Sequence, residues 1–406
     1  MSASHPRIAL YGHDTQGLGH LRRNLVLASA FAADAPDGLG AEVLLLTGAS
    51  EIGLFPRPRG VDALVLPGVR KDDRGDYAPR QLRGDLTEVV RFRSAMIEAA
   101  LASFPPELVV VDKTPRGFGG ELECALRGLR AAGTRTVLGL RDVLDDVPTT
   151  RAEWRAGAGD QAVRDLFDEV WVYGDPAIHD VRVATGMAPD VAERTHHLGY
   201  LSADRIDPVE RQHRPDTEGR PYVLVMAGGG QDGAELTRRA AAMEPPPGHE
   251  LIVLTGPQLA EEEVRAVRAL AEDRPRVQVM RFSRHGAAWL TGAAAVITMG
   301  GANTVAEIID TDVPALVVPR VTPRAEQLVR AEALAAHGHL SVLRPDEVTT
   351  ALLDQWVHAA VGTRTERAGI NRAGVAATTE RARALLSFPR SQRRADLLTL
   401  RSPHVA

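Results

Sequence analysis

The stretch Met-Gly-Gly-Ala-Asn-Thr-Val-Ala-Glu, residues 299–307, joins an expected buried strand to an expected helix. The apolar run 293–298 before it is typical of a buried strand, and Val305, Ile308 and Ile309 fall on one helical face. Two glycines therefore stand at a strand-to-helix turn, where the backbone can approach a ligand closely and free N–H groups attract an anion. This succession of strand, glycine turn and helix predicts an α/β fold.

Two side chains of the stretch are candidates for ligand contacts. We expect Thr304 to cap the helix. Glu307 lies one turn further along, where its carboxylate can accept hydrogen bonds from a diol. The alternative is an ordinary structural turn with a solvated glutamate, since strand-to-helix turns are common.

The composition is that of a soluble globular protein of two domains. The chain has 406 residues, with 44% hydrophobic and 25% charged residues. A net charge of −5 and an aromatic content of 4% argue against a nucleic-acid binder. One cysteine, Cys124, fits a reducing cytoplasm, and we expect no signal peptide and no membrane-spanning run. Residues 52–59 mix apolar and basic side chains, which leaves weak peripheral contact with a membrane or a lipid-linked acceptor open.

The first half alternates strands with helices, as doubly wound domains do. A glycine-rich loop, residues 12–20, leads from the first strand into a helix that runs to Phe31. Ligands of open α/β sheets bind beyond the carboxyl ends of the strands. Charged residues follow two strand ends and are candidates for the cleft: Asp112, Lys113, Arg141 and Asp142. The expected strands are residues 7–11, 42–47, 61–66, 108–111, 136–140 and 170–173.

The second half repeats the alternation after a polar linker and opens with three consecutive glycines. Gly228, Gly229 and Gly230 follow a strand and precede a helix, so their N–H groups can cradle a diphosphate together with those of Gln231 and Gly233. Glu326 and Gln327 follow a later strand and can hydrogen-bond sugar hydroxyls. These features describe a nucleotide-sugar site, and the absence of a His/Cys cluster predicts that no metal and no cofactor is needed.

At this point the chain resembles the GT-B glycosyltransferases, most closely the MurG-like group with a glycosyltransferase family 28 C-terminal domain. The resemblance covers nearly the whole chain and is strongest over residues 223–343. Residues 229–233 resemble the Gly-Gly-Ser-Gln-Gly loop of the group, with Asp232 as a departure, and residues 301–307 match its Gly-Ala-x-Thr-x-x-Glu motif. The resemblance implies a donor site made of Gly228, Gly229, Gly230, Gln231, Gly233, Phe282, Ser283, Met299, Gly300, Gly301, Asn303, Thr304, Glu307, Glu326 and Gln327.

Within that site the resemblance also implies individual roles. Glu307 would hold the ribose hydroxyls, Phe282 and Ser283 would seat the base, and Glu326–Gln327 would stand where the group has a Gln-Gln pair for the donor sugar.

In the first half, Leu18-Gly19-His20 resembles the Gly-Gly-His of the same group. The resemblance places His20 at the start of the first helix, facing the cleft, where imidazole can accept a proton from an acceptor hydroxyl. A purely positioning role for His20 is an equal alternative, and His13 and Asp142 are rival bases. Gly17, Gly19, His13, Asp112, Lys113 and Arg141 are the candidate acceptor or cleft residues. We interpret Arg22 and Arg23 as solvated.

The expected architecture is two Rossmann-like domains facing across a cleft. The expected bounds are 1–201 for the acceptor domain, 202–221 for the linker, 222–375 for the donor domain, and 376–406 for a helix returning to the first domain and a tail. The expected function is metal-independent transfer of a hexose-type sugar from an NDP-sugar, with UDP the expected nucleotide, to an acceptor that the sequence does not identify. Departures from the peptidoglycan enzyme, such as 139–142, argue against a peptidoglycan acceptor.

Two other functions remain open. One is a nucleotide-sugar 2-epimerase of the same fold, which would need acid and base carboxylates from Asp112, Glu121 and Asp142. The other is a non-catalytic protein that binds sugar nucleotides, for which His20 and Asp142 would both be dispensable.

Overall fold

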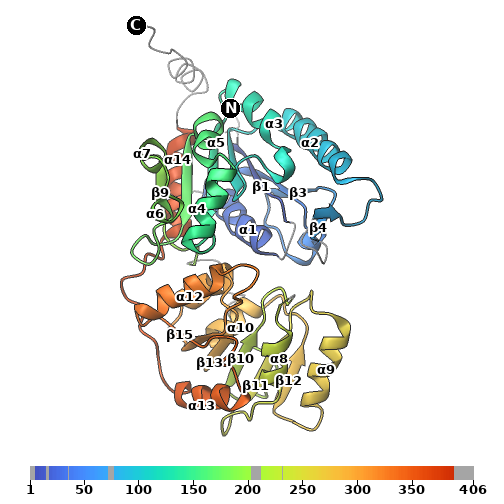
Figure 1. The fold of residues 1–406 in the computed structure, drawn as a ribbon, viewed down its shortest axis with the longest axis vertical. Coiled ribbons are helices and arrows are strands. Elements are labelled where there is room, and N and C mark those ends of the chain that lie inside the picture. The colour runs from blue at the N-terminus through green and yellow to red at the C-terminus, as the bar shows by residue number, and fades with distance from the viewer. Residues whose placement is uncertain are drawn as a thin grey trace.

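The structure of the chain is a computed structural model that describes residues 5–14, 18–34, 36–71, 77–202, 212–230 and 232–387. Two α/β bodies lie one above the other in Figure 1, the first in blue and green and the second in yellow and orange. Each is built on its own parallel sheet. The prediction of two doubly wound domains is therefore confirmed.

The first sheet has seven strands in the order β3-β2-β1-β6-β7-β8-β9. All neighbouring strands are parallel, so their carboxyl ends meet at one edge. β1 and β6 lie side by side at the point where the strand order reverses, which is where open sheets bind ligands. The strands are β1 Arg7–Gly12, β2 Glu42–Thr47, β3 Val61–Val65, β6 Leu108–Asp112, β7 Arg135–Arg141, β8 Glu169–Tyr173 and β9 Thr195–His197.

Helices cover both faces of this sheet and bury two apolar cores, one around Ile8 and Phe31 and one around Tyr11 and Phe167. The helices are α1 Gly19–Ala32, α2 Leu86–Ser103, α3 Glu123–Ala131, α4 Val147–Ala156, α5 Gly159–Leu166, α6 Val181–Thr185 and α7 Pro189–Ala192, with short turns η1 Ser50–Leu54 and η2 Phe118–Gly120. Within the described part of the chain, no helix is both long and apolar enough to cross a membrane.

Residues 67–83, a polar stretch with several arginines and aspartates, contain a pair of short strands. Strands β4 (Val69–Lys71) and β5 (Tyr77–Pro79) pair antiparallel across it. These strands could not be predicted from the sequence, because each is only three residues long and shows no alternation of apolar and polar residues. This pair of strands matters for the cleft, because Tyr77 lies edge-on to Phe118 at 4.9 Å between ring centroids.

The second sheet has six parallel strands in the order β12-β11-β10-β13-β14-β15. β10 and β13 are its neighbours at the reversal of strand order, and the two glycine turns follow them. The elements are β10 Tyr222–Met226, α8 Ala234–Ala241, β11 Glu250–Leu254, α9 Glu261–Ala271, β12 Val277–Met280, α10 Gly286–Gly292, β13 Ala295–Thr298, α11 Ala302–Ile309, β14 Ala315–Val317, α12 Glu326–Ala336, β15 Ser341–Val342 and α13 Thr350–Ala360.

The last helix, α14 (Gly374–Leu386), lies beside the first domain, as its red ribbon shows in Figure 1. Its Ala382 and Leu385 are buried in the same core as Ile8 and Phe31. A short antiparallel bridge between Leu201 and Ala373 brings the end of the first domain against this returning segment. Residues 203–211 of the expected linker and the tail 388–406 lie outside the described residues.

Candidate active site

A cavity of about 780 Å³ lies between the two domains and is lined by both. The first domain contributes the candidates His13, Gly19, His20, Lys113 and Arg141, together with Arg22, Arg23, Phe55, Tyr77 and Phe118. The second contributes the candidates Gly228, Gly229, Gly230, Phe282, Ser283, Met299, Gly301, Asn303, Thr304, Glu326 and Gln327. Most of the residues proposed from the sequence therefore meet in one place.

Some candidates do not line this cavity. Gly233 and Gly300 pack closely against Ala227 and Val317 instead. Glu307 and Asp112 are buried, and each contacts a residue that lines the cavity, Arg22 and His20 respectively. Gly17 and Gln231 lie outside the described residues.

The first glycine turn of the second domain packs so closely that one position needs glycine. Gly230 has φ +94°, and a Cβ atom there would lie 2.5 Å from the carbonyl oxygen of Thr255. Because a side chain is excluded, the loop lies flat against residues 255–256 and its backbone faces the cavity. The helix α8 begins directly after it, so this geometry suits an anion such as a diphosphate.

The second glycine turn starts α11 without the cap that the sequence suggested. The residue before the helix is Gly301, and no side chain caps it, so the prediction that Thr304 caps α11 is wrong. Asn303 instead donates a hydrogen bond from Nδ2 to the carbonyl oxygen of Gly19 at 3.0 Å, across the domain boundary. The turn thus contacts the glycine loop of the first domain.

Glu307 also contacts the first domain. Arg22 donates from Nη2 to Oε1 of Glu307, whose side chain is almost fully buried. The interpretation of Arg22 as a solvated charge is wrong, because it lines the cavity and pairs with this carboxylate. A ribose diol that binds Glu307 would have to share it with Arg22.

His20 is held by a buried carboxylate at the end of β6. Its Nδ1 lies 3.0 Å from Oδ2 of Asp112, and Arg23 donates to the same carboxylate through Nε and Nη2. Arg23 Nη2 also lies 3.2 Å from the Nδ1 atom, but the carboxylate can only accept, so we assign the Nδ1 proton to the bond with Asp112. This leaves Nε2 for the cavity.

Ion pairing keeps Asp112 charged. Burial alone would raise the pKa of Asp112, but Arg23 and His20 hold it well below its usual range. Arg23 is 5% exposed, so the interpretation of this arginine as solvated is wrong as well. An ionised Asp112 can orient the imidazole and stabilise its protonated form.

His13 lies next to His20, with ring centroids 4.6 Å apart. Burial, together with the charges of His20 and Lys113, lowers the pKa of His13 well below its usual range. The lowered pKa makes His13 a weaker base than an ordinary imidazole, and His20 is oriented by Asp112. His20 is therefore the better candidate for accepting a proton.

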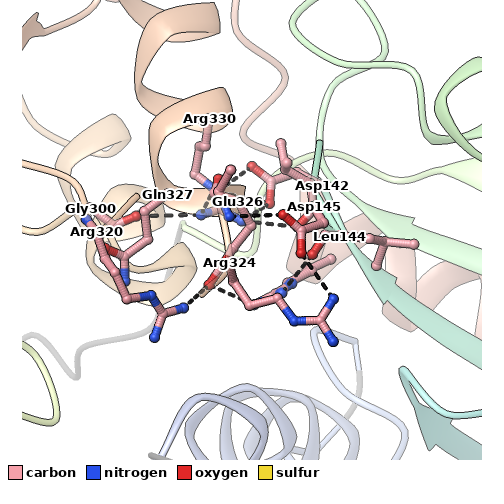
Figure 2. Close-up of polar contacts among 12 residues, drawn as sticks. Asp142, Leu144, Asp145, Gly300, Arg320, Arg324, Glu326, Gln327 and Arg330 are labelled. Carbon is pink, nitrogen blue, oxygen red and sulfur yellow. Dashed lines mark hydrogen bonds and ion pairs between the residues drawn. The ribbon is translucent and has the colours of Figure 1, made fainter. Parts of the chain in front are cut away.

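The structure does not support Asp142 as a base. Arg330, on α12, donates to both carboxylate oxygens of Asp142 at 2.8–3.0 Å, and both side chains are buried (Figure 2). Although burial alone would raise the pKa of Asp142, Arg330 lowers it. We therefore correct this assignment: Asp142 holds the two domains together, and the sequence alone could not reveal a partner 188 residues away.

Glu326 and Gln327 line the cavity within a network of arginines shown in Figure 2. Arg320 donates through Nη2 to Glu326 at 2.5 Å and through Nη1 to Asp232 at 2.9 Å, and its backbone N–H donates to Gln327 Oε1 at 2.8 Å. Arg320 thus connects Asp232, in the first glycine turn, with Glu326 and Gln327. Sequence reasoning missed it, although its place three residues after the end of β14, beyond the carboxyl edge of the sheet, was a usable signal.

The carboxylates that an epimerase would need are all engaged. Glu121 accepts hydrogen bonds from Tyr11 and Arg93 and is buried, Asp112 pairs with Arg23, and Asp142 pairs with Arg330. Neither Glu121 nor Asp142 lines the cavity. The geometry therefore does not favour acid–base chemistry by these residues. Among the described residues, no three His, Cys, Asp or Glu side chains are grouped to hold a metal ion.

Two parallel-sheet domains facing across a cleft lined by glycine turns define the GT-B class. Solved structures with this architecture include MurG of Acinetobacter baumannii, 17% identical with a TM-score of 0.52 over 97% of this chain and 99% of that one. A putative UDP-N-acetylglucosamine 2-epimerase from Listeria monocytogenes is 14% identical, with a TM-score of 0.57 over 99% of both chains. These likenesses show the GT-B fold, which both enzyme classes share.

One family model matches the second domain and the returning segment that follows it. Residues 223–381 match the model of the glycosyltransferase family 28 C-terminal domain, so the chain is a GT-B glycosyltransferase with a domain of this family. This confirms the resemblance noted from the motifs.

Two curated relatives carry the name UDP-N-acetylglucosamine–N-acetylmuramyl-(pentapeptide) pyrophosphoryl-undecaprenol N-acetylglucosamine transferase. The one from Acidothermus cellulolyticus is 26% identical over 348 residues, 81% of this chain and 83% of the relative. The one from Synechococcus is 28% identical over 206 residues, 47% of this chain and about half (55%) of the relative's length.

Proposed function

We propose that this glycosyltransferase moves a hexose-type sugar from a nucleotide-diphosphate sugar, with UDP the expected nucleotide, to a hydroxyl group of an acceptor, without a metal ion. The observation that carries the proposal is the pair His20–Asp112, which faces the two glycine turns of the second domain across one cavity. The names of the two curated relatives, which specify a UDP-sugar donor, support the choice of nucleotide.

The proposed chemistry divides between the two domains. In the first, His20 Nε2 accepts the proton of the acceptor hydroxyl as its oxygen attacks the anomeric carbon, while Asp112 fixes the tautomer through Nδ1. In the second, the N–H groups of Gly228 and Gly229 and the start of α8 stabilise the charge that develops on the leaving diphosphate, while the N–H of Gly230 closes the turn on Ala227. Backbone N–H groups and the helix dipole then do what a metal ion does in other transferases.

The acceptor and the location are narrower proposals. Both relatives are named for an undecaprenol-linked acceptor, whereas residues 139–142 of this chain depart from the pattern of the peptidoglycan enzyme. We therefore propose an acceptor other than the peptidoglycan precursor and a cytoplasmic site of action, with weak contact at the inner membrane face as an alternative.

The first experiment is a thermal-shift panel with UDP, dTDP, GDP and ADP. We expect UDP to stabilise the wild type by about 2.7 kcal/mol at a hundred times its dissociation constant. Glu307→Gln should lose most of this stabilisation, because the neutral amide keeps only one acceptor oxygen, and its NH2 group cannot accept a hydrogen bond from the second ribose hydroxyl. Arg22→Gln is the matched control, since it breaks the same ion pair but leaves the carboxylate in place.

The panel separates three results. Stabilisation by UDP that Glu307→Gln loses and Arg22→Gln keeps supports the donor site. Equal loss in both variants means that the ion pair, and not the ribose contact, matters. Stabilisation by no nucleotide contradicts the proposed function and leaves the glycine turns as structural features.

A further inference from the structure

One of the two lysines of the chain stands in the cleft in an unusual backbone conformation. Lys113 follows the last residue of β6 and has φ +68°. Its N–H donates to the carbonyl oxygen of Gly139 at 2.8 Å, and the next N–H, of Thr114, donates back to Asp112 at 2.8 Å. Residues other than glycine rarely adopt this conformation, and those that keep it cluster at functional sites. The chain has 37 glycines, yet a lysine occupies this position.

The ammonium group of Lys113 has no partner among the residues that the structure describes. It lines the cavity, and among the described residues its side chain has no hydrogen bond and no ion pair. Lysine offers three N–H donors, and partly buried ones are ordinarily satisfied. The donors of Lys113 are therefore available to a ligand in the cleft.

A second cation beside Lys113 is only partly neutralised. Arg141, at the end of β7, donates from Nη2 to the carbonyl oxygen of Leu144 at 2.9 Å. Its Nη1 is 3.8 Å from Glu326 Oε1, an oxygen that already accepts from Arg320 at 2.5 Å. Its buried Nε has no hydrogen-bond partner in the described part of the chain. Arg141 thus shares a carboxylate that another arginine holds more closely.

The electrostatic surroundings agree with this geometry. Burial lowers the pKa of Lys113 to about 8, and the next causes are the positive charges of Arg141 and Arg324, with Glu153 and Glu326 opposing them less strongly. Burial likewise lowers the pKa of Arg141 to about 10, although Glu326 opposes this. Arg324 is itself paired with Asp145 and Glu153. An anion bound in the cavity would raise the pKa of Lys113 and of Arg141, because it would stabilise their charged forms.

We propose that Lys113 and Arg141 form a subsite for an oxyanion, a carboxylate or a phosphate, carried by the acceptor. Both residues belong to the first domain and lie at the carboxyl ends of neighbouring strands of its sheet, whereas the expected diphosphate cradle belongs to the second domain. Lys113 directly follows Asp112, the residue that holds His20, so an oxyanion bound there would anchor the acceptor beside the proposed base. The assignment of this oxyanion to the acceptor rests on the proposed function.

The test measures the binding of inorganic phosphate and of acetate by thermal shift, at ionic strength held constant with sodium chloride. Saturating UDP is present, so that the diphosphate cradle is filled. We expect the wild type to bind at least one of the two anions saturably. Lys113→Gln should weaken that binding about tenfold or more, as the loss of a charge-assisted hydrogen bond does. Lys113→Arg should restore it to within about threefold, because the charge and donors remain. Lys71→Gln, at the other lysine of the chain, is the matched control and should bind as the wild type does.

A second measurement uses the unmodified sequence, so a variant that fails to fold does not end the test. Trace acetylation with acetic anhydride at pH 8, read by mass spectrometry, compares Lys113 with Lys71. We expect phosphate or acetate to protect Lys113 and leave Lys71 unchanged, with UDP bound.

The results either support the subsite or remove it. Absence of anion binding in the wild type, binding that Lys113→Gln retains, or protection of both lysines alike overturns the proposal. If UDP binds but abolishes anion binding at Lys113, the residue belongs to the donor phosphate site, and the acceptor subsite is wrong while the proposed function stands. If UDP does not bind, the proposed function fails, and the same titrations without UDP still decide whether Lys113 binds an oxyanion.

Discussion

Arg330 of the second domain and Asp142 of the first form a buried ion pair, with Arg330 Nε and Nη2 donating to both carboxylate oxygens at 2.8–3.0 Å. The two side chains are 1% and 3% exposed. Because the two residues belong to different domains, their ion pair fixes the position of one domain relative to the other beside the cleft. Arg324 makes a parallel connection to Asp145, visible beside it in Figure 2.

Removing one partner of this pair should be costly. Arg330→Met leaves the carboxylate of Asp142 buried without a counter-ion, and we expect the free energy of unfolding, measured by urea denaturation, to fall by about 3–5 kcal/mol. The double variant Asp142→Asn/Arg330→Met should recover most of the loss, because no charge then stays buried. If the single variant is as stable as the wild type and small-angle scattering shows no opening of the domains, the pair is not a domain clamp.

Releasing Glu307 from Arg22 should tighten donor binding. If the ribose diol has to share Glu307 with Arg22, Arg22→Gln removes the competitor, and the dissociation constant for UDP should fall about three- to tenfold by isothermal titration. Arg22→Lys, which keeps the positive charge, should stay close to the wild type. Weaker binding in Arg22→Gln would show instead that Arg22 contacts the nucleotide itself.

The proposed base can be tested before the acceptor is known, through slow hydrolysis of the donor. We expect His20→Gln to lower the rate of UDP release from a UDP-sugar by about 10²- to 10⁴-fold, because proton removal from the attacking hydroxyl or water is lost. The dissociation constant for UDP should stay unchanged, since His20 lies on the other domain from the glycine turns. A larger loss in His13→Gln than in His20→Gln would transfer the role to the neighbouring imidazole.

Mild acid should destabilise the first domain through a buried histidine. Burial lowers the pKa of His197, on β9, to about 4, whereas an unfolded histidine has a pKa of about 6.5. The unfolded chain therefore takes up this proton first, so the stabilising contribution is complete above pH ~6.5 and is lost as the pH falls towards ~4. That loss is on the order of 3 kcal/mol.

The pH dependence is checked by urea denaturation between pH 7 and pH 4. His197→Gln should flatten the fall of the free energy of unfolding in this window, and His358→Gln, at an exposed histidine of α13, should not. Parallel curves for His197→Gln and the wild type would contradict the prediction.

The sequence by itself determined the fold class and the positions of the glycine turns. Apolar runs such as those of β1, β6, β10 and β13 are buried on both faces, so their composition marks them as central strands of parallel sheets. Glycines after β10 and β13 mark the turns, because local sterics decide which residues can stand there. These are local properties, and a sequence carries them directly.

Only the tertiary structure decided which charges meet. The pairs Arg22–Glu307, Arg330–Asp142 and His20–Asp112 join residues 285, 188 and 92 positions apart, and no local pattern of the chain encodes them. The same reason explains two wrong predictions. Asp142 was interpreted as a base and Arg23 as a surface charge, because their partners, Arg330 and Asp112, are distant in the sequence. Whether a charged side chain is a catalytic group, a clamp or an open ligand contact such as Lys113 depends on the desolvation and counter-charges that the folded chain places around it.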